Sequence, residues 1–530
     1  MVNARALVSL AFAAVFATFA LQLSIEHLTF FVSDDAYYYL NVARNIVRGA
    51  GSSFDGIDPS NGYHPLWMLC LLPVYWVFGS STGAALRAVM LTQVVLVCAT
   101  IWLGWDIYRR YRANALSVMV AIALAVTLFS PLQMMFNGLE TDLVVLLLML
   151  ILHADAKRSF LAPNQPGARL ALFGLLLGLL VLARLDEALL LVGIAICSIV
   201  RLRSAPLARR IPSLLRTYWP AIAVFALVMT PYFVWNLGEF GHFTPISGTL
   251  KATFPHLTFR PEVISLYAPY VIGTLLAGIA LIPLWRGADG IVPRPNLELL
   301  TGVWIGCVIQ VGWAVFCTNF GTFQWHFAAH VPTICLILSF CAAHLVRDPG
   351  PAFTAAAAVL LLAVAIVFNV FAYKDKGDFH GGSYAAALWA RDNTPGDTVF
   401  ALGDAGVFGY FSERATINLD GLINSYDYQN YVREGRIMEF LRERHVEYIA
   451  DAFAPCSYSE RHVWVRSYLP PRPPLTVAWG LTVARNEEVY RGEDSVFRPL
   501  TRQKPNCFII WPFDKVTLKV RDPSTPLRQR

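Results

Sequence analysis

The chain has 530 residues, of which 56% are hydrophobic and only 15% are charged; its mean hydropathy is +0.51 and its formal net charge is +6. A soluble domain carries about 25% charged residues. This shortfall excludes an ordinary soluble enzyme and, with repeated apolar runs of about 20 residues, predicts a polytopic membrane protein. The net positive charge is not a nucleic-acid signal, because the Arg residues fall in loops between apolar runs, as cytoplasmic charge does.

About eleven segments are apolar enough to cross a membrane. They are expected at residues 5–25, 84–107, 114–134, 141–155, 169–183, 186–200, 217–236, 268–285, 298–317, 327–346 and 352–373. The first is expected to be a retained anchor, since no A-x-A-like cleavage site is placed as a signal peptide needs. With the N-terminus in the cytoplasm, the basic clusters at 109–112, 157–158 and 201–210 all fall inside, as the positive-inside rule requires.

The first outer loop, about residues 26–83, is expected to hold two interfacial helices. Residues 65–79 are apolar but short, are interrupted by Pro73, and are rich in aromatic rings, which favour the headgroup zone. From Ala36 to Arg48, apolar and polar residues occupy opposite helical faces. Asn41 and Arg44 lie on the polar face.

Two adjacent carboxylates, Asp34 and Asp35, come directly before the Ala36–Arg48 pattern. Neighbouring carboxylates repel each other and are costly to desolvate. Capping of the following helix explains one Asp. It does not explain the second, so the pair indicates a functional role.

Further charged residues are expected on the outer side. Glu140 and Asp142 begin an apolar helix, and are interpreted either as helix N-terminal residues or as a second acidic loop that faces the first. Arg184 lies between two short spans; it pairs with Asp186 or Glu187, or contacts a lipid phosphate.

Lys251 is the only Lys in the outer membrane loops. It either neutralises a phosphate or snorkels at the interface. His64 and His326, with Asn61 and Tyr63 nearby in sequence to His64, are expected to line a cavity, because neither His shows metal-ligand spacing by itself.

Residues 374–530 have ordinary charge and many turn residues, and predict a second, extracytoplasmic α/β domain after the membrane domain of residues 1–373. Helices are expected near 383–392 and within 422–445, strands near 397–402, 415–419 and 446–450, and an extended polyproline connector at 469–475. Outside the cytoplasm, Cys456 and Cys507 can form a disulfide; the alternative is two unpaired thiols. The other seven Cys lie in or beside apolar runs and are expected to be small core residues.

An Asp-Asp pair after the first span, followed by interfacial helices, resembles the GT-C superfamily of polyprenyl-phosphate-sugar glycosyltransferases. The stretch from Asp34 to Asn45, the Asn61–Trp67 segment and the Gly138–Asp142 motif carry the resemblance. It is nearest to bacterial aminoarabinose transferases, protein O-mannosyltransferases and mycobacterial arabinofuranosyltransferases. In topology it covers roughly residues 1–373, and it is specific only in the first two loops.

The resemblance implies an inverting transfer of a sugar from a polyprenyl-phosphate donor to a glycan, lipid or protein acceptor on the outer face of a bacterial plasma membrane. It implies that a first-loop carboxylate is the general base, with Asp34 the first choice and Asp35 the second. Arg184 and Lys251, and then Arg44, are the candidate phosphate ligands. Branches of the family differ in their use of a divalent cation, so a metal at Asp35, Glu140 and Asp142 stays open.

Two other functions remain alternatives. A transporter or flippase of lipid-linked sugars is expected to show inverted repeats and broken helices near the midplane. A surface-polysaccharide polymerase or ligase would use similar donors through a large outer loop rich in Arg and His. The sequence has no phosphate-binding Gly-x-x-x-x-Gly-Lys-Ser/Thr loop, so the energy of the reaction must arrive in the substrate.

Overall fold

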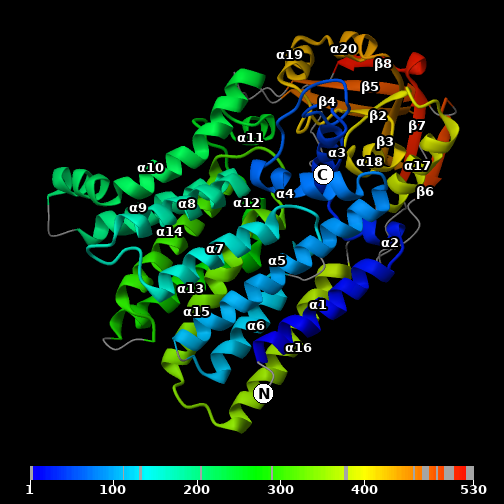
Figure 1. The fold of residues 1–530 in the computed structure, drawn as a ribbon. Coiled ribbons are helices and arrows are strands. Elements are labelled where there is room, and N and C mark those ends of the chain that lie inside the picture. Colours follow the sequence, from blue (N-terminus) through cyan, green and yellow to red (C-terminus); the bar gives the residue numbers. More distant parts are fainter. Residues whose placement is uncertain are drawn as a thin grey trace.

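The structure is a computed structural model that describes residues 4–111, 113–129, 134–202, 206–287, 291–374, 380–456, 460–467, 477–484, 487–493 and 506–520. A body of long helices carries an α/β domain at one end, and the N-terminal helix begins at the other end (Figure 1). The first-loop helices α3 (Asp34–Val47) and α4 (Pro65–Phe78) lie where the two parts meet.

A helix stands at each of the eleven expected spans. They are α1 (Ala4–Gln22), α5 (Thr82–Arg110), α6 (Ala115–Phe129), α7 (Thr141–Lys157), α8 (Gly167–Ala183), α9 (Ala188–Arg201), α10 (Leu207–Phe240), α13 (Ala268–Arg286), α14 (Arg294–Phe316), α15 (His330–Leu345) and α16 (Pro351–Lys374). Four of these, α5, α10, α13 and α14, are long and apolar enough to cross a membrane by themselves. The chain is therefore an integral membrane protein, while the count of about eleven spans stays a prediction.

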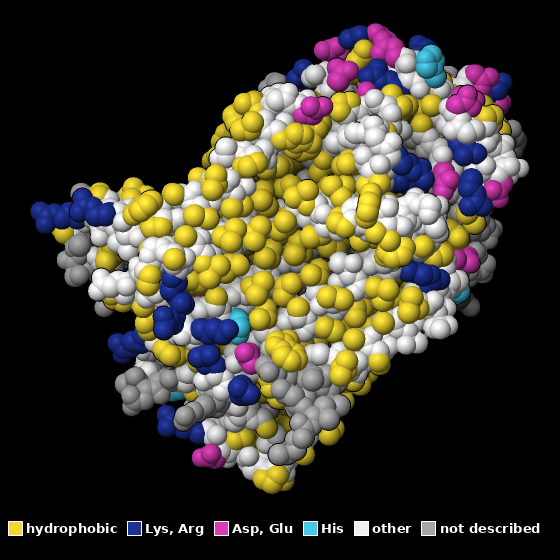
Figure 2. Space-filling model, in the orientation of Figure 1, with side chains coloured by type: hydrophobic (Ala, Val, Ile, Leu, Met, Phe, Trp, Pro, Cys, Tyr) yellow, Lys and Arg dark blue, Asp and Glu magenta, His cyan; other side chains and the backbone are white. Residues whose placement is uncertain are grey.

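The surface of the helical body separates apolar from charged side chains. Figure 2 shows a broad band of hydrophobic side chains over the helices, with Lys and Arg gathered at the end away from the α/β domain and charges of both signs on that domain. Lipid tails accept the band without cost, because they are as apolar as the exposed side chains. The gathering of basic residues agrees with the expected cytoplasmic end.

Helix α3 is less exposed than the sequence predicts. Its polar face was expected to meet water, yet Asn41 and Arg44 are 3% and 5% exposed. The reason is that α18 (Gly406–Ser412) of the C-terminal domain packs on α3. Asn41 donates from its amide to the Phe54 carbonyl at 3.0 Å, so burial leaves this side chain satisfied. The interfacial helix is thus a buried element between two domains.

The C-terminal domain has two sheets. The larger has the strand order β2-β1-β3-β7-β6, with β1 parallel to β2 and β3 and with antiparallel pairs beyond β3; the smaller is antiparallel, in the order β4-β5-β8. The strands are β1 (Val399–Leu402), β2 (Ala415–Asn418), β3 (Val446–Pro455), β4 (Glu460–Ser467), β5 (Val477–Ala484), β6 (Tyr490–Glu493), β7 (Asn506–Pro512) and β8 (Thr517–Val520). The helices besides α18 are α17 (His380–Asn393), α19 (Tyr426–Glu434) and α20 (Ile437–Glu443).

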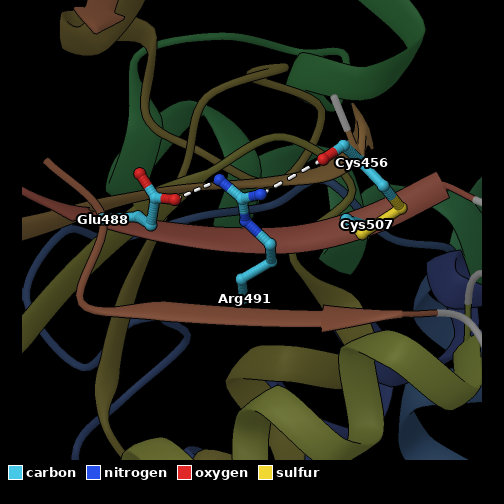
Figure 3. The surroundings of a disulfide bond; sticks show 4 residues. All are labelled: Cys456, Glu488, Arg491 and Cys507. Carbon is cyan, nitrogen blue, oxygen red and sulfur yellow. Dashed lines mark hydrogen bonds and ion pairs between the residues drawn. A yellow bond between two sulfur atoms is a disulfide. The ribbon is translucent and has the colours of Figure 1, made fainter. Parts of the chain in front are cut away.

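The strands and helices predicted between 383 and 450 are all present, whereas α18 and the strands after β3 were not predicted. The polyproline connector at 469–475 lies outside the described residues. Cys456, just after β3, and Cys507 in β7 form a disulfide with a Cα–Cα distance of 5.0 Å, the first of the two alternatives that the sequence left open. Arg491 of β6 donates to the Cys456 carbonyl at 3.2 Å and pairs with Glu488 beside it (Figure 3).

Candidate functional site

The first loop meets the start of α7, in agreement with one of the two interpretations of the Glu140–Asp142 motif. The Ser33 amide donates to the Asn137 carbonyl at 2.9 Å, and the indole N–H of Trp67 donates to the Gly138 carbonyl at 3.0 Å. These bonds hold the start of α3 against the start of α7. The Asp pair and the acidic motif therefore stand on the same side of the molecule.

Asp34 is used for docking between domains. Its two carboxylate oxygens accept from the backbone N–H groups of Gly406 and Val407, both at 2.9 Å, at the start of α18. The side chain is 6% exposed, and burial raises its pKa to about 7 despite these two bonds. Neither Asp caps α3 itself, although one of them was expected to; that cap position belongs to Ser33, which makes no side-chain bond.

Glycine is required at the other side of this contact. A β-carbon at Gly406 would lie 2.1 Å from the backbone oxygen of Asp34, far inside van der Waals contact. The same close approach occurs between Gly62 of the first loop and the Leu422 carbonyl, again at 2.1 Å. The C-terminal domain therefore sits directly on the backbone of the first loop.

Asp35, unlike Asp34, has a carboxylate without hydrogen-bond partners among the described residues. It is half-buried, and its carboxylate makes no hydrogen bond or ion pair with any residue that the structure describes. Burial raises its pKa, the positive charge of Lys251 lowers it, and the carboxylates of Asp420 and Glu140 raise it. Asp35 is thus an unpaired carboxylate with a cation near it, which is the arrangement of a group able to accept a proton.

Arg184 is linked to this region through Glu140, whose charge also acts on Asp35. Its Nε donates to Asp186 at 2.7 Å, and its Nη1 donates to Glu140 at 3.0 Å and to the Trp325 carbonyl at 3.1 Å. Asp186 lies in η2 (Leu185–Glu187), the turn that joins α8 to α9. Nη2 makes no hydrogen bond to a described residue, so one face of the guanidinium stays available to an anion.

Lys251 ends α11 (Ile246–Lys251). Its ammonium makes no hydrogen bond or ion pair within the described ranges and lies 5.8 Å from the ring centre of Phe320. Asn61 positions this helix, because its side-chain oxygen accepts from the Ile246 amide at 3.0 Å while its amide donates to Asn236 at 3.0 Å. Asn61 is therefore a positioning residue for Lys251 and offers no free polar atom of its own.

The two His residues lie near the same charges. His64 Nε2 is 3.7 Å from Glu140, and burial lowers the pKa of His64. Burial also lowers the pKa of His326, as do the charges of Arg184 and Lys251. Both rings are accordingly neutral hydrogen-bonding groups at physiological pH. Tyr63 is buried and its hydroxyl is 2.6 Å from that of Ser52, so it supports the loop rather than the cavity.

Arg44 does not join this group. Its Nη1 donates to the Tyr410 carbonyl at 2.9 Å and its Nη2 donates to Asn41. It lies nine residues after Asp35, which on an α-helix means about 13 Å along the axis and half a turn around it. A role for Arg44 in binding the same phosphate as Lys251 is therefore not supported by its position.

The proposed metal ligands do not form a metal site. No group of three or more His, Cys, Asp or Glu side chains within the described part of the chain is placed to hold a metal ion. Glu140 is engaged by Arg184, and Asp142 is 1% exposed with neither carboxylate oxygen hydrogen-bonded. The donor set of Asp35, Glu140 and Asp142 does not fit a cation, and no step of the chemistry is assigned to one.

Sequence reasoning missed the contribution of the C-terminal domain. Asp420, after β2, accepts from the hydroxyl of Tyr38 at 3.1 Å and from the amide of Asn418 at 3.0 Å, and its charge acts on Asp35. Leu422 packs on Ile246 and Leu250 of α11. No local pattern marks residues 418–422 as part of a site, because they meet the first loop only in the folded chain.

Comparison with known proteins shows which proteins this chain resembles. A family model described as a domain of unknown function (DUF8728) matches residues 373–496. No curated protein matches the sequence. The oligosaccharyltransferase AglB from Archaeoglobus fulgidus, solved with an inhibitory peptide and a dolichol-phosphate, is similar in structure with a TM-score of 0.52 at 13% identity, over 84% of this chain and 69% of AglB.

ArnT from Cupriavidus metallidurans is similar with a TM-score of 0.52 at 15% identity, over 81% of this chain and 91% of ArnT. The arabinofuranosyltransferase AftD from Mycobacteria aligns with 94% of this chain and 39% of its own at 15% identity, but its TM-score of 0.46 is too low to carry an argument. The chain has the fold of the GT-C glycosyltransferases, as the first-loop motif predicted. At these identities the likeness establishes the fold alone.

Proposed function

We propose that the protein is an inverting glycosyltransferase that moves a sugar from a polyprenyl-phosphate donor to an acceptor hydroxyl on the outer face of the membrane. The observation that carries the proposal is the unpaired Asp35 carboxylate, on which the charges of Lys251 and Glu140 act, together with Arg184, which is bound to that Glu140 and keeps its Nη2 free of described partners. A base with cations near it is what such a displacement requires. The GT-C fold supports the same reaction by analogy.

In this proposal Asp35 is the base and Asp34 is not. Asp35 removes the proton of the acceptor hydroxyl while that oxygen forms a bond to the anomeric carbon. The bond from that carbon to the phosphate oxygen breaks, and the electron pair leaves with the polyprenyl phosphate. Lys251 and Arg184 hold the departing anion, and the proton passes from Asp35 to solvent. Attack opposite the leaving group inverts the anomeric centre.

The order of the two carboxylates is the reverse of the order that the sequence resemblance implied. Asp34 already accepts two backbone hydrogen bonds and is closed off from solvent by α18. A general base must reach the proton that it removes. Asp35 meets that requirement without any rearrangement of the domains.

Transport of a lipid-linked sugar is the weaker alternative, because the candidate groups lie in the loops next to the C-terminal domain and not at the middle of the helical body. The proposal also includes the polyprenyl-phosphate donor, the glycan, lipid or protein acceptor, a location in the bacterial plasma membrane and a cytoplasmic N-terminus. So does the division into a membrane domain of residues 1–373 and an outer domain of residues 374–530.

The test starts from cells that lack the protein. Extracted lipids, analysed by mass spectrometry, should contain an accumulated polyprenyl-phosphate sugar that wild-type protein clears and the Asp35→Asn variant does not. The Asp392→Asn variant, a change of an exposed carboxylate in α17, serves as the matched control and should clear the lipid. Clearance by Asp35→Asn at the wild-type rate would remove Asp35 from the role of base.

A further inference from the structure

A second basic pocket lies at the far ends of α3 and α4. Its volume is about 240 Å³, and the residues that matter for its chemistry are Arg44, Arg48, Trp76 and Ser80. Because Arg44 lies about 13 Å along the helix axis from Asp35 and on the opposite side of the helix, this pocket is separate from the Asp35 site. Nothing in the proposed transfer reaction uses it.

Arg44 has an unmet hydrogen-bonding need here. The side chain is 5% exposed, and its Nε is buried without an acceptor, while its two terminal nitrogens are taken by Tyr410 and Asn41. A buried N–H of a charged group without a partner is destabilising. Arg44 lines the pocket, so an anion there would supply the missing acceptor once the side chain shifts to turn this N–H toward it.

Arg48 adds a second positive charge one turn further along α3. It is exposed, and its guanidinium makes no hydrogen bond or ion pair with the described residues. Like charges four residues apart on a helix repel each other, and the positive charge of Arg48 acts on Arg44 together with the negative charge of Glu413. A phosphate bound between the two guanidiniums would turn this repulsion into two charge-assisted contacts.

The outer side of α4 provides an apolar surface next to these charges. Leu69, Trp76 and Val77 are 59%, 81% and 59% exposed, and their spacing of seven and eight residues places them on one side of the helix. In a membrane protein such a stripe faces lipid, and an exposed Trp belongs at the headgroup level. The stripe ends at the pocket, because Trp76 belongs to both.

We propose that this pocket binds the phosphate of an anionic membrane phospholipid. Arg44 Nε and the Arg48 guanidinium contact the phosphate, the Ser80 hydroxyl faces the headgroup, and the acyl chains lie along the Leu69–Val77 side of α4. Charge complementarity and the continuous apolar stripe favour a lipid over a free anion. The bound lipid would hold α3 and α4 at the membrane surface.

The experiment uses the full chain in detergent, titrated with dioleoyl phosphatidylglycerol while its thermal midpoint is recorded. We expect saturation to raise the midpoint by about 2 °C or more, because a ligand that binds only the folded state stabilises it. For Arg48→Gln we expect the lipid concentration at half-maximal shift to rise about tenfold, the loss of one charged contact. Arg433→Gln, which removes an exposed charge from α19, should behave as wild type.

Three outcomes would overturn the proposal. Zwitterionic dioleoyl phosphatidylcholine could give the same shift at the same concentration, which would remove the charge argument. Inorganic phosphate alone could saturate the effect, which would make this a site for a free anion. Undecaprenyl phosphate could displace phosphatidylglycerol and lose affinity in Arg48→Gln, which would assign the pocket to the donor lipid. None of these results depends on whether Asp35 catalyses transfer.

Discussion

Two regions of the molecule, a docking seam and an open charged group, differ most at two adjacent residues. The docking seam is the contact of α3 with the C-terminal domain, through Asp34 on Gly406 and Val407 and through Arg44 on Tyr410. The open charged group consists of Asp35, Lys251 and Nη2 of Arg184, whose charged atoms have no hydrogen bond or ion pair within the described residues. Successive helical residues point about 100° apart, so one carboxylate of the pair is satisfied by backbone N–H groups and the next is left unpaired. Sequence proximity therefore does not imply a shared role.

The largest contrast is expected in activity. Asp35→Asn should lower the rate of transfer by about 10²–10⁴-fold, the usual contribution of a general base, while donor-lipid binding stays near wild type. Asp34→Asn should lower the rate far less. Single-turnover assays with purified protein in detergent separate binding from chemistry. Equal losses in both variants would show that the two carboxylates act as one unit, and the contrast would fail.

The stability that the docking seam contributes should depend on pH, because the seam includes Asp34. Its pKa rises from 3.8 in the unfolded chain to about 7 in the folded one, so the folded state binds the extra proton. Its contribution to stability is present below about pH 4 and is lost as the pH rises through about 7, at a slope near 1.4 kcal/mol per pH unit. Asp34→Asn should lack this slope.

Other carboxyls titrate in the same range, so the measured quantity is the difference between wild type and Asp34→Asn. Thermal midpoints recorded from pH 4 to pH 8 give that difference. A constant difference across the range would contradict the assignment of a raised pKa to Asp34.

Gly406→Ala tests the seam by packing alone. The new methyl group would meet the Asp34 backbone oxygen at 2.1 Å, and overpacking of this kind costs about 1–3 kcal/mol. We expect faster limited proteolysis of the C-terminal domain and a lower thermal midpoint. Gly396→Ala, where nothing lies within 4 Å of the added β-carbon, is the matched control and should be neutral.

Lys251→Gln should have the smallest effect. It tests the role of Lys251 in donor binding and its influence on the pKa of Asp35. We expect the KM for the donor to rise about tenfold, as one charged contact to the phosphate is lost. The positive charge of Lys251 lowers the pKa of Asp35, so its removal should move the acidic limb of the pH–rate profile to higher pH. A limb that stays in place would mean that a group other than Asp35 is the base.

Much of the fold was predictable because it depends on local pattern. Apolar runs marked the helices of the membrane body, turn residues and short apolar segments marked the strands near 399 and 415, and a charge pattern marked the basic end. The Cys456–Cys507 pair was one of two alternatives that the sequence left open, and the structure shows the bond. The meeting of the first two loops was also predicted, because both lie on the same side of the expected topology.

The candidate site was less predictable because its members come from distant segments. Asn61 and Tyr63 were expected in the cavity but support the loops, since their partners are Asn236 and Ser52. Arg44 was expected near a donor phosphate but faces Tyr410. Asp420 was not expected at all, and it acts on Asp35 across almost 400 residues of sequence.

By itself the sequence determined the class of fold, the helical segments and the two charged loops. Hydropathy and charge patterns are local properties that can be read along the chain. Which of two adjacent carboxylates is closed and which is open was decided only by the tertiary structure. That choice depends on where the amides at the start of α18 come to rest on α3, and no local pattern in either segment encodes a contact between residues 34 and 406.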